Sequence, residues 1–268
     1  MNMLAAVGPW DLVADGYADA NTEFFTGFNR AAMNLLELTK TDRVLDVGCG
    51  PGTLALVASE KVASIDALDF SENMIAVLRK RIKQEGLSNV TPLVGDGQNL
   101  PHPDNEFDAA LSMFGLMFFP DRAKGLAEMY RALKSGGRAC VASWAPTDQS
   151  PLMQVLFGAL RAINPEIPKP QTDISSLENP DVLAGELTQA GFKNVEVHKV
   201  THGVGFSDAK TFWEDLTKGS APVLMMRKKM GEDVWQEKSK IAVKYIEETV
   251  KTFPATLASD AWLGVAVK

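Results

Sequence analysis

Three glycines at alternate positions follow a short apolar run that contains an acidic residue, in the segment VLDVGCGPGTLAL at residues 44–56. Gly48, Gly50 and Gly52 let the backbone turn sharply and approach a ligand without a Cβ in the way. Asp46 stands just before them. The segment therefore predicts a strand, a glycine loop and a helix, with a small ligand at the carboxyl end of the strand.

The spacing of the glycines separates two kinds of cofactor. A dinucleotide site prefers G-x-G-x-x-G, in which backbone N–H groups cradle a pyrophosphate. Here Thr53 stands where the third glycine would be, and Pro51 removes an N–H group from the loop. The carboxylate of Asp46 would also repel a phosphate and favours a ligand that carries an ammonium group. A dinucleotide oxidoreductase stays open as a third possibility that Pro51 and Thr53 oppose.

Two further acidic residues follow the next apolar runs. Asp69 ends the second run, where a carboxylate can accept hydrogen bonds from both ribose hydroxyls, although Asp66 is close enough to compete for this role. Asp96 follows the third run in LVGDGQNLP, where a carboxylate can bind the exocyclic amine of an adenine. Acids at the ends of three consecutive strands indicate a positively charged ligand that contains adenosine.

Four stretches together resemble the class I S-adenosylmethionine-dependent methyltransferases, and more narrowly the type 11/25 small-molecule branch that includes the ubiquinone and menaquinone C-methyltransferases. The stretches are VLDVGCGPGTLAL, ALDFSENMI, VGDGQNLPHPDNEFDAALSMFGLMFFPD and RALKSGGRACVASW, and they cover residues 44–144 almost without a gap. The resemblance implies S-adenosylmethionine as the cofactor and methyl transfer to carbon, oxygen or nitrogen of a small organic acceptor.

The resemblance also implies roles for individual side chains. Asp46 and the glycine loop would hold the methionine part of the cofactor, and Asp69 would bind the ribose. The remaining expected cofactor contacts are Phe70 and Met74 near the adenine, Asp96, Gly97 and Gln98 at the adenine edge, Ser112 and Met113 in the methyl-transfer chamber, and Tyr17 or Trp10 closing over the site from an N-terminal helix.

The segment after the fourth apolar run, SMFGLMFFP, limits the classes of methyl acceptor that the chain is expected to take. Amino-directed DNA and RNA methyltransferases often carry an Asn/Asp-Pro-Pro-aromatic segment there, and protein arginine methyltransferases carry paired glutamates. Neither occurs in this chain, and no set of clustered oxygen ligands for a metal is found. We therefore expect an apolar mouth, lined by methionine and phenylalanine, that takes a small hydrophobic or aromatic acceptor.

Catalysis by a methyltransferase depends mainly on positioning and the exclusion of water, and a general base is needed only if the acceptor loses a proton early. His202 lies near the expected mouth and is the weak candidate for that base; His102 and His198 are less suitable. Cys49 is interpreted as a small buried residue. A catalytically silent sensor or scaffold that binds S-adenosylmethionine or S-adenosylhomocysteine stays open as the alternative, because no acceptor-binding residue is assigned.

Short apolar runs alternate with helical patterns between residues 42 and 144, which is typical of βαβ units and a parallel sheet. Ser71 is a predicted helix N-cap and Gly86 a predicted C-cap. Five strands are expected here and two later, at Arg43–Val47, Val62–Leu68, Val90–Val94, Asp108–Met113, Arg138–Trp144, Asn194–Val200 and Trp262–Val267. The prediction is a doubly wound, Rossmann-like α/β sheet of seven strands, with the last antiparallel and with helical cap insertions.

The chain is predicted to divide into five parts. These are an N-terminal helical cap (1–40), a cofactor-binding core (41–145), a cap insertion (146–191), C-terminal core strands (192–202 and 261–268) and a helical cap insertion (203–260). We expect the two insertions to form the acceptor pocket. In the second insertion, one buried helical face is predicted from Val234, Ile241, Tyr245 and Thr249. Met225, Met226 and Met230 are interpreted as packing on the core while the neighbouring basic residues stay solvated.

Composition agrees with a small-molecule enzyme in a reducing compartment. The chain has 268 residues, a net charge of −7 and two cysteines, Cys49 and Cys140, so a disulfide framework is excluded and a cytoplasmic location is expected. A net negative charge does not provide the positive electrostatic field that drives binding to nucleic acid. The N-terminus shows no secretory pattern, and the longest apolar run, 109–119, is shorter than the roughly 20 residues of a membrane helix. The oligomeric state is left open between monomer and homodimer.

Overall fold

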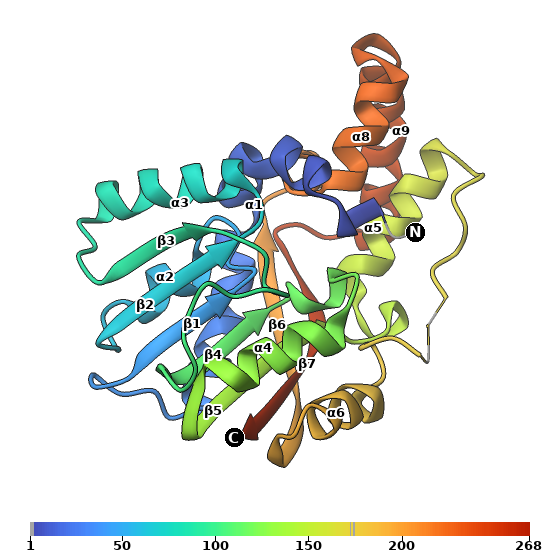
Figure 1. The fold of residues 1–268 in the computed structure, drawn as a ribbon. Coiled ribbons are helices and arrows are strands. Elements are labelled where there is room, and N and C mark those ends of the chain that lie inside the picture. The colour runs from blue at the N-terminus through green and yellow to red at the C-terminus, as the bar shows by residue number, and fades with distance from the viewer. Residues whose placement is uncertain (1–2, 172, 174) are drawn as a thin grey trace.

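A seven-stranded sheet forms the centre of the computed structural model, which describes residues 3–171, 173 and 175–268 (Figure 1). The strands are β1 (Arg43–Val47), β2 (Ser64–Asp69), β3 (Val90–Val94), β4 (Phe107–Met113), β5 (Leu133–Trp144), β6 (Lys193–Phe206) and β7 (Ala255–Val267). Their order is β3-β2-β1-β4-β5-β7-β6. The pairs among β1 to β5 are parallel, and β7 runs antiparallel to both β5 and β6. This arrangement confirms the predicted doubly wound sheet with its last strand antiparallel.

Helices cover both faces of the sheet. They are α1 (Val7–Leu35), α2 (Thr53–Ala58), α3 (Glu72–Glu85), α4 (Arg122–Ala132), α5 (Pro151–Ile163), α6 (Pro180–Gln189), α7 (Ala209–Lys218), α8 (Ala221–Met230) and α9 (Glu232–Val250), with short 3-10 turns at Met3–Ala5, Leu116–Phe118 and Thr147–Gln149. Side chains of a strand alternate between the two faces. Val44 thus packs with α1, α2 and α3, whereas its neighbour Leu45 packs with α4.

The expected caps of α3 are present. The hydroxyl of Ser71 accepts a hydrogen bond of 3.1 Å from the backbone N–H of Met74, and Gly86 ends the helix in the left-handed region at φ +65°. A side-chain oxygen satisfies one of the free N–H groups at a helix start, and glycine adopts positive φ without the steric cost of a Cβ. These two local signals place both ends of α3.

A single long helix, α1, forms most of the N-terminal part that was expected as a helical cap. It packs against α2, α3, α7, α8 and β6. Two side-chain hydrogen bonds fix its position: Arg81 of α3 donates to the hydroxyl of Thr22 at 2.9 Å, and Asn21 donates to the carbonyl oxygen of Gly219 at 3.0 Å. The helix is therefore held from the core on one side and from the α7–α8 turn on the other.

The last two strands are longer than the sequence indicated. β6 continues to Phe206 and β7 begins at Ala255, so the helices between them occupy 209–250 rather than 203–260. Pairing of β6 with β7 runs on past the last partner of β5, down to Phe206 opposite Ala255. Gly203 and Gly205 interrupt the alternating pattern in this stretch, which explains why the sequence shows the strand ending early.

The predicted buried face of α9 was wrong. Val234 and Ile241 are 49% and 45% exposed, whereas Trp235 and Ile246 are buried. The ring of Trp235 stacks on Trp213 of α7, with centroids 5.5 Å apart. The buried face of α9 therefore contains Trp235 rather than its neighbour Val234, because a buried tryptophan contributes more apolar area than valine or isoleucine.

Two other expectations about side chains hold. Met225, Met226 and Met230 of α8 are all partly buried, the last two against the core, while Lys228 and Lys229 are exposed. Cys49 and Cys140 are both free and buried. None of the helices in the described part of the chain combines the length and the hydropathy of a membrane span.

Candidate active site

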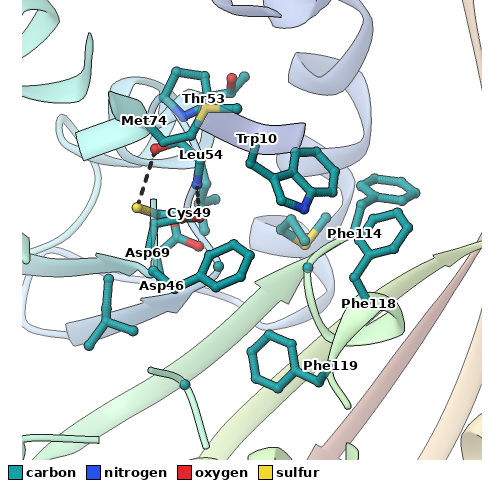
Figure 2. A pocket seen from close by; sticks show the side chains of 18 of the residues that line it. Trp10, Asp46, Cys49, Thr53, Leu54, Asp69, Met74, Phe114, Phe118 and Phe119 are labelled. Carbon is teal, nitrogen blue, oxygen red and sulfur yellow. Dashed lines mark hydrogen bonds between the residues drawn. The ribbon is translucent and has the colours of Figure 1, made fainter. Parts of the chain in front are cut away.

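A cavity of about 370 Å³ opens at the carboxyl ends of the parallel strands (Figure 2). Its wall combines α1 with the segments that follow β1, β2, β3 and β4. Twelve residues singled out from the sequence line it: Trp10, Tyr17, Asp46, Gly48, Gly50, Asp69, Phe70, Met74, Asp96, Gly97, Gln98 and Met113. Residues separated by up to about a hundred positions in the chain thus meet at one site, as the crossover connections of a parallel sheet require.

The glycine loop forms the floor of this cavity. Gly48, Gly50 and Gly52 have φ values of +72°, +54° and +81°, a region that L side chains rarely adopt. The backbone N–H groups of Gly48 and Cys49 donate to the carbonyl oxygen of Leu68 at 2.8 and 3.0 Å. The loop is therefore attached to the end of β2, and all three glycines are required by the backbone conformation.

Asp69 joins the glycine loop to the start of α3. Its Oδ2 atom accepts a hydrogen bond of 2.8 Å from the backbone N–H of Gly50, and its Oδ1 atom accepts one of 2.9 Å from Ser71. Burial raises the pKa of Asp69 to about 6, although these two hydrogen bonds act in the opposite direction. Asp66, the competing carboxylate, instead pairs with His102 at 3.2 Å and does not line the cavity.

Asp46 presents an unsatisfied oxygen at the cavity. The residue is 1% exposed, and its Oδ2 atom has no hydrogen-bond partner among the described residues. Burial, and then the nearby charge of Asp69, raise the pKa of Asp46 to about 8. Within the described chain, no lysine, arginine or histidine lines the cavity. Two buried carboxyl groups without a basic neighbour fit a ligand that brings its own positive charge and hydrogen-bond donors.

Asp96 and Gln98 form a polar rim. Asp96 Oδ1 accepts hydrogen bonds from the backbone N–H of Gln98 at 2.8 Å and from its side-chain amide at 3.1 Å. Gln98 Oε1 in turn accepts from the backbone N–H of Asp121 at 2.9 Å. Between them, a Cβ on Gly97 would lie 2.6 Å from Phe119 and 2.7 Å from Val47. The rim is consequently fixed in shape and exposes polar edges to a flat ligand.

Aromatic rings form the side of the cavity opposite the acids. Trp10 lies 5.1 Å from Phe118, Tyr17 stacks on Phe25 at 6.0 Å, and Phe25 contacts Phe114 at 5.2 Å between ring centroids. Figure 2 shows Trp10, Phe114 and Phe118 grouped across the cavity from Asp46 and Asp69. Such a wall favours a flat apolar ligand and keeps water away from it.

Sequence reasoning missed several lining residues and misplaced others. The cavity is lined by residues between Ala5 and Pro120, and none of the described residues of the two insertions lines it; the insertions pack over α1 and the sheet. Their part in an acceptor pocket stays a prediction. Phe114, Phe118 and Phe119 line the cavity, as expected for the apolar segment after the fourth strand. The lining residues that were not singled out are Ala5, Phe25, Asn29, Leu54, Leu68, Gly95, Gly115 and Pro120. The spacing of Phe25 and Asn29, four residues apart on α1, was the available signal, since such positions share one helix face.

Three singled-out residues lie outside the lining. Gly52 precedes α2 and packs against Leu78. Ser112 is fully buried, and its hydroxyl accepts a hydrogen bond of 3.0 Å from the backbone N–H of Leu116, which shapes the turn after β4. The ring of His202 contacts Phe28 at 5.7 Å between centroids, so its expected role as a base has no support from its position.

Neither Cys49 nor Tyr17 is ionised in this environment. Burial, followed by the charges of Asp46 and Asp69, raises the pKa of the Cys49 thiol well above its usual value. Burial and the charge of Asp69 likewise raise the pKa of Tyr17. A neutral thiol is a weak nucleophile, which agrees with the interpretation of Cys49 as a small packing residue.

Comparisons with known proteins agree with this geometry. Residues 44–137 match a family described as a methyltransferase domain. The chain is 33% identical over 192 residues to a demethylmenaquinone methyltransferase of Anoxybacillus flavithermus, covering 66% of this chain and 81% of the relative, and 29% identical over 214 residues to one of Bacteroides fragilis, covering 73% and 87%. A phosphoethanolamine N-methyltransferase of Haemonchus contortus, solved in complex with S-adenosyl-L-methionine, superposes with a TM-score of 0.59 at 20% identity, over 96% of this chain and 57% of that one.

Proposed function

Because this chain belongs to the class I S-adenosylmethionine-dependent methyltransferases, in the branch that includes the quinone C-methyltransferases, we propose that it methylates a small aromatic acceptor of the quinol type at a ring carbon. S-adenosylmethionine is the cofactor. The observation that carries the proposal is the ring of aromatic side chains facing the acids across one cavity. The relatives named demethylmenaquinone methyltransferases support the same acceptor class.

The acidic side of the cavity fits the cofactor. The unsatisfied Oδ2 atom of Asp46 would accept from the ammonium group of the methionine part, and Asp69 would accept from the ribose while it holds the loop through Gly50. The rim at Asp96 and Gln98 would bind the adenine edge. Each assignment pairs an acceptor oxygen of the protein with a donor of the cofactor.

The aromatic side fits the acceptor. When bound, the cofactor supplies an electrophilic methyl group on a positively charged sulfur. Phe114 and Phe118 would hold a flat ring by stacking and exclude water from it. Met113, the residue before Phe114, lines the same cavity. The chain thus promotes transfer by fixing the distance and angle between two reactants in a dry site, which can account for several kcal/mol of barrier lowering, roughly 7–11 kcal/mol at best.

The alternative of a catalytically silent binding protein is not favoured. The relatives of this chain are named as methyltransferases, and the acids expected to hold the cofactor line the cavity. A dinucleotide oxidoreductase is likewise opposed, since the family match is to a methyltransferase domain.

A transfer assay tests the proposal. The purified protein is incubated anaerobically with S-adenosylmethionine and, separately, with 1,4-naphthohydroquinone, catechol and a primary aromatic amine, and products are identified by mass spectrometry and NMR. We expect a new methyl group on a ring carbon of the naphthohydroquinone. Methylation of only catechol oxygen or of the amine would contradict the quinol assignment. Binding of the cofactor with no transfer to any of the three would instead support the silent binder.

A further inference from the structure

The side chain of Asn29 is a buried polar group that the cofactor assignment leaves unused. It is 2% exposed, belongs to the middle of α1 and lines the cavity. Its Oδ1 atom has no hydrogen-bond partner among the described residues. A buried amide oxygen without a partner is rare in folded proteins, because it forfeits the hydrogen bonds it made to water in the unfolded chain.

The packing around Asn29 gives no structural reason for an amide. Its helix neighbours Phe28 and Ala32 are fully buried in the apolar core, and Phe25, one turn earlier, lines the same cavity. Leucine has nearly the same size and would fill this position without an unsatisfied oxygen. An amide that lowers stability at a cavity wall is what a ligand-binding role would require.

The chemistry of the free atom selects the ligand group. Oδ1 accepts hydrogen bonds, so its partner must carry an N–H or O–H group. The cofactor's carboxylate has no proton to give, and its ammonium group is matched by the charged acceptor Asp46. Asn29 lies one helical turn after Phe25, and both line the cavity together with Phe114, whose ring centroid is 5.2 Å from that of Phe25.

We propose that Oδ1 of Asn29 accepts a hydrogen bond from a hydroxyl group of the aromatic acceptor and so selects hydroxylated rings over rings that lack the hydroxyl. Asn29 is then a specificity-determining residue, and this inference rests on the proposed function. A site built to pair with a substrate hydroxyl discriminates strongly against an analogue without one, because its own polar group stays unpaired.

The test measures binding, so it does not depend on turnover. The affinities of 1-naphthol and 1-methylnaphthalene, which differ by a hydroxyl in place of a methyl group of similar size, are measured by calorimetry on the protein saturated with S-adenosylhomocysteine. Wild type, Asn29→Leu and Asn29→Ala are compared, with Asn34→Leu as a control, since Asn34 is an exposed residue on the same helix. Thermal unfolding is recorded for each variant.

We expect wild type and Asn34→Leu to prefer 1-naphthol by about tenfold or more, and both Asn29 variants to lose this preference while they keep their affinity for S-adenosylhomocysteine. Asn29→Leu should unfold at the same temperature as wild type or higher. An unchanged preference in the Asn29 variants would overturn the inference and leave the proposed function standing. A tenfold loss of S-adenosylhomocysteine affinity in them would assign the amide to the cofactor and also overturn it. Binding of neither naphthalene by wild type would overturn the inference and the proposed aromatic acceptor together.

Discussion

The Oδ2 atom of Asp69 accepts a 2.8 Å hydrogen bond from the backbone N–H of Gly50, so the carboxylate expected to bind the ribose also holds the loop expected to bind the methionine part. One side chain thus couples the two halves of the cofactor site. Its second oxygen, bonded to the backbone N–H of Ser71, extends the coupling to the first turn of α3. The geometry of the site depends on this one carboxylate.

Substituting Asp69 should therefore weaken cofactor binding more than the loss of one hydrogen bond would. Asp69→Ala removes an acceptor for the ribose and releases Gly50 and Ser71, and we expect S-adenosylmethionine affinity to fall by about a hundredfold. Asp66→Asn is the matched control on the same strand, because Asp66 pairs with His102 away from the cavity. Calorimetric titration checks both variants. Equal affinity of Asp69→Ala and wild type would refute the ribose assignment.

Two glycines of the same loop should respond differently to alanine. Both have positive φ, which costs about 1 kcal/mol for a residue with a Cβ. At Gly52 the added Cβ would also collide with the side chain of Leu78, whereas at Gly50 it meets no atom of the described chain within 4 Å. We expect Gly52→Ala to lower the free energy of unfolding by about 3 kcal/mol in total.

Gly50→Ala should instead fold with only the smaller backbone cost and lose cofactor affinity, because Gly50 lines the cavity and its Cβ would take up ligand space. Chemical denaturation and calorimetry on the two variants separate these effects. If Gly50→Ala bound S-adenosylhomocysteine as tightly as wild type, the loop would not contact the cofactor at that position.

The sequence predicted those features that depend on local signals. β1 and β3 have the predicted bounds, and Ser71 and Gly86 cap α3 as expected, since glycine loops, polar caps and apolar runs act over a few residues. The acids expected to bind the cofactor belong to the same class. Asp46 and Asp69 lie at the carboxyl ends of apolar runs and Asp96 follows one closely, so the edge of the sheet on which each lies is determined once the strand is recognised.

The part of the aromatic wall that α1 contributes could not be predicted, because it depends on how a distant helix docks. Phe25 and Phe28 are three residues apart on α1 and equally apolar, yet Phe25 lines the cavity and Phe28 is fully buried in the core. Only the rotation of α1 against α2 and β6 distinguishes them. The buried face of α9 likewise depends on a contact with a distant helix, because the ring of Trp235 stacks on Trp213 of α7.

Cofactor affinity should rise with pH near neutrality. In the ligand-free protein Asp46 has a pKa of about 8, so it holds its proton at pH 6 to 7. An ammonium group beside it favours the carboxylate, and binding then releases the proton. We expect S-adenosylhomocysteine affinity to increase by up to about tenfold per pH unit between about pH 6 and 7.5. Calorimetry in buffers of different ionisation enthalpy measures the proton release. Asp46→Asn should bind more weakly and show a flatter profile, and a flat profile in wild type would contradict the assignment.

The same carboxyl group should make the ligand-free fold less stable as pH rises. The pKa of Asp46 is about 8 in the folded protein against an ordinary value of 3.8, so between these limits the folded state holds a proton that the unfolded state has released. The stability that this proton contributes is complete below about pH 4 and is lost as pH rises to about 8, and Asp69, with a pKa of about 6, adds a smaller loss of the same sign. Asp46→Asn removes the larger part. Without ligand, the free energy of unfolding of Asp46→Asn should match that of wild type near pH 4. Near pH 8 it should exceed the wild-type value by a few kcal/mol, at most about 1.4 kcal/mol per unit of pKa shift.

Thermal unfolding across this pH range checks the prediction. Saturating S-adenosylhomocysteine is the control, because it should stabilise wild type far more than the variant at pH 7.5. A constant difference between the two proteins from pH 4 to 8 would mean that Asp46 is ionised in the empty cavity.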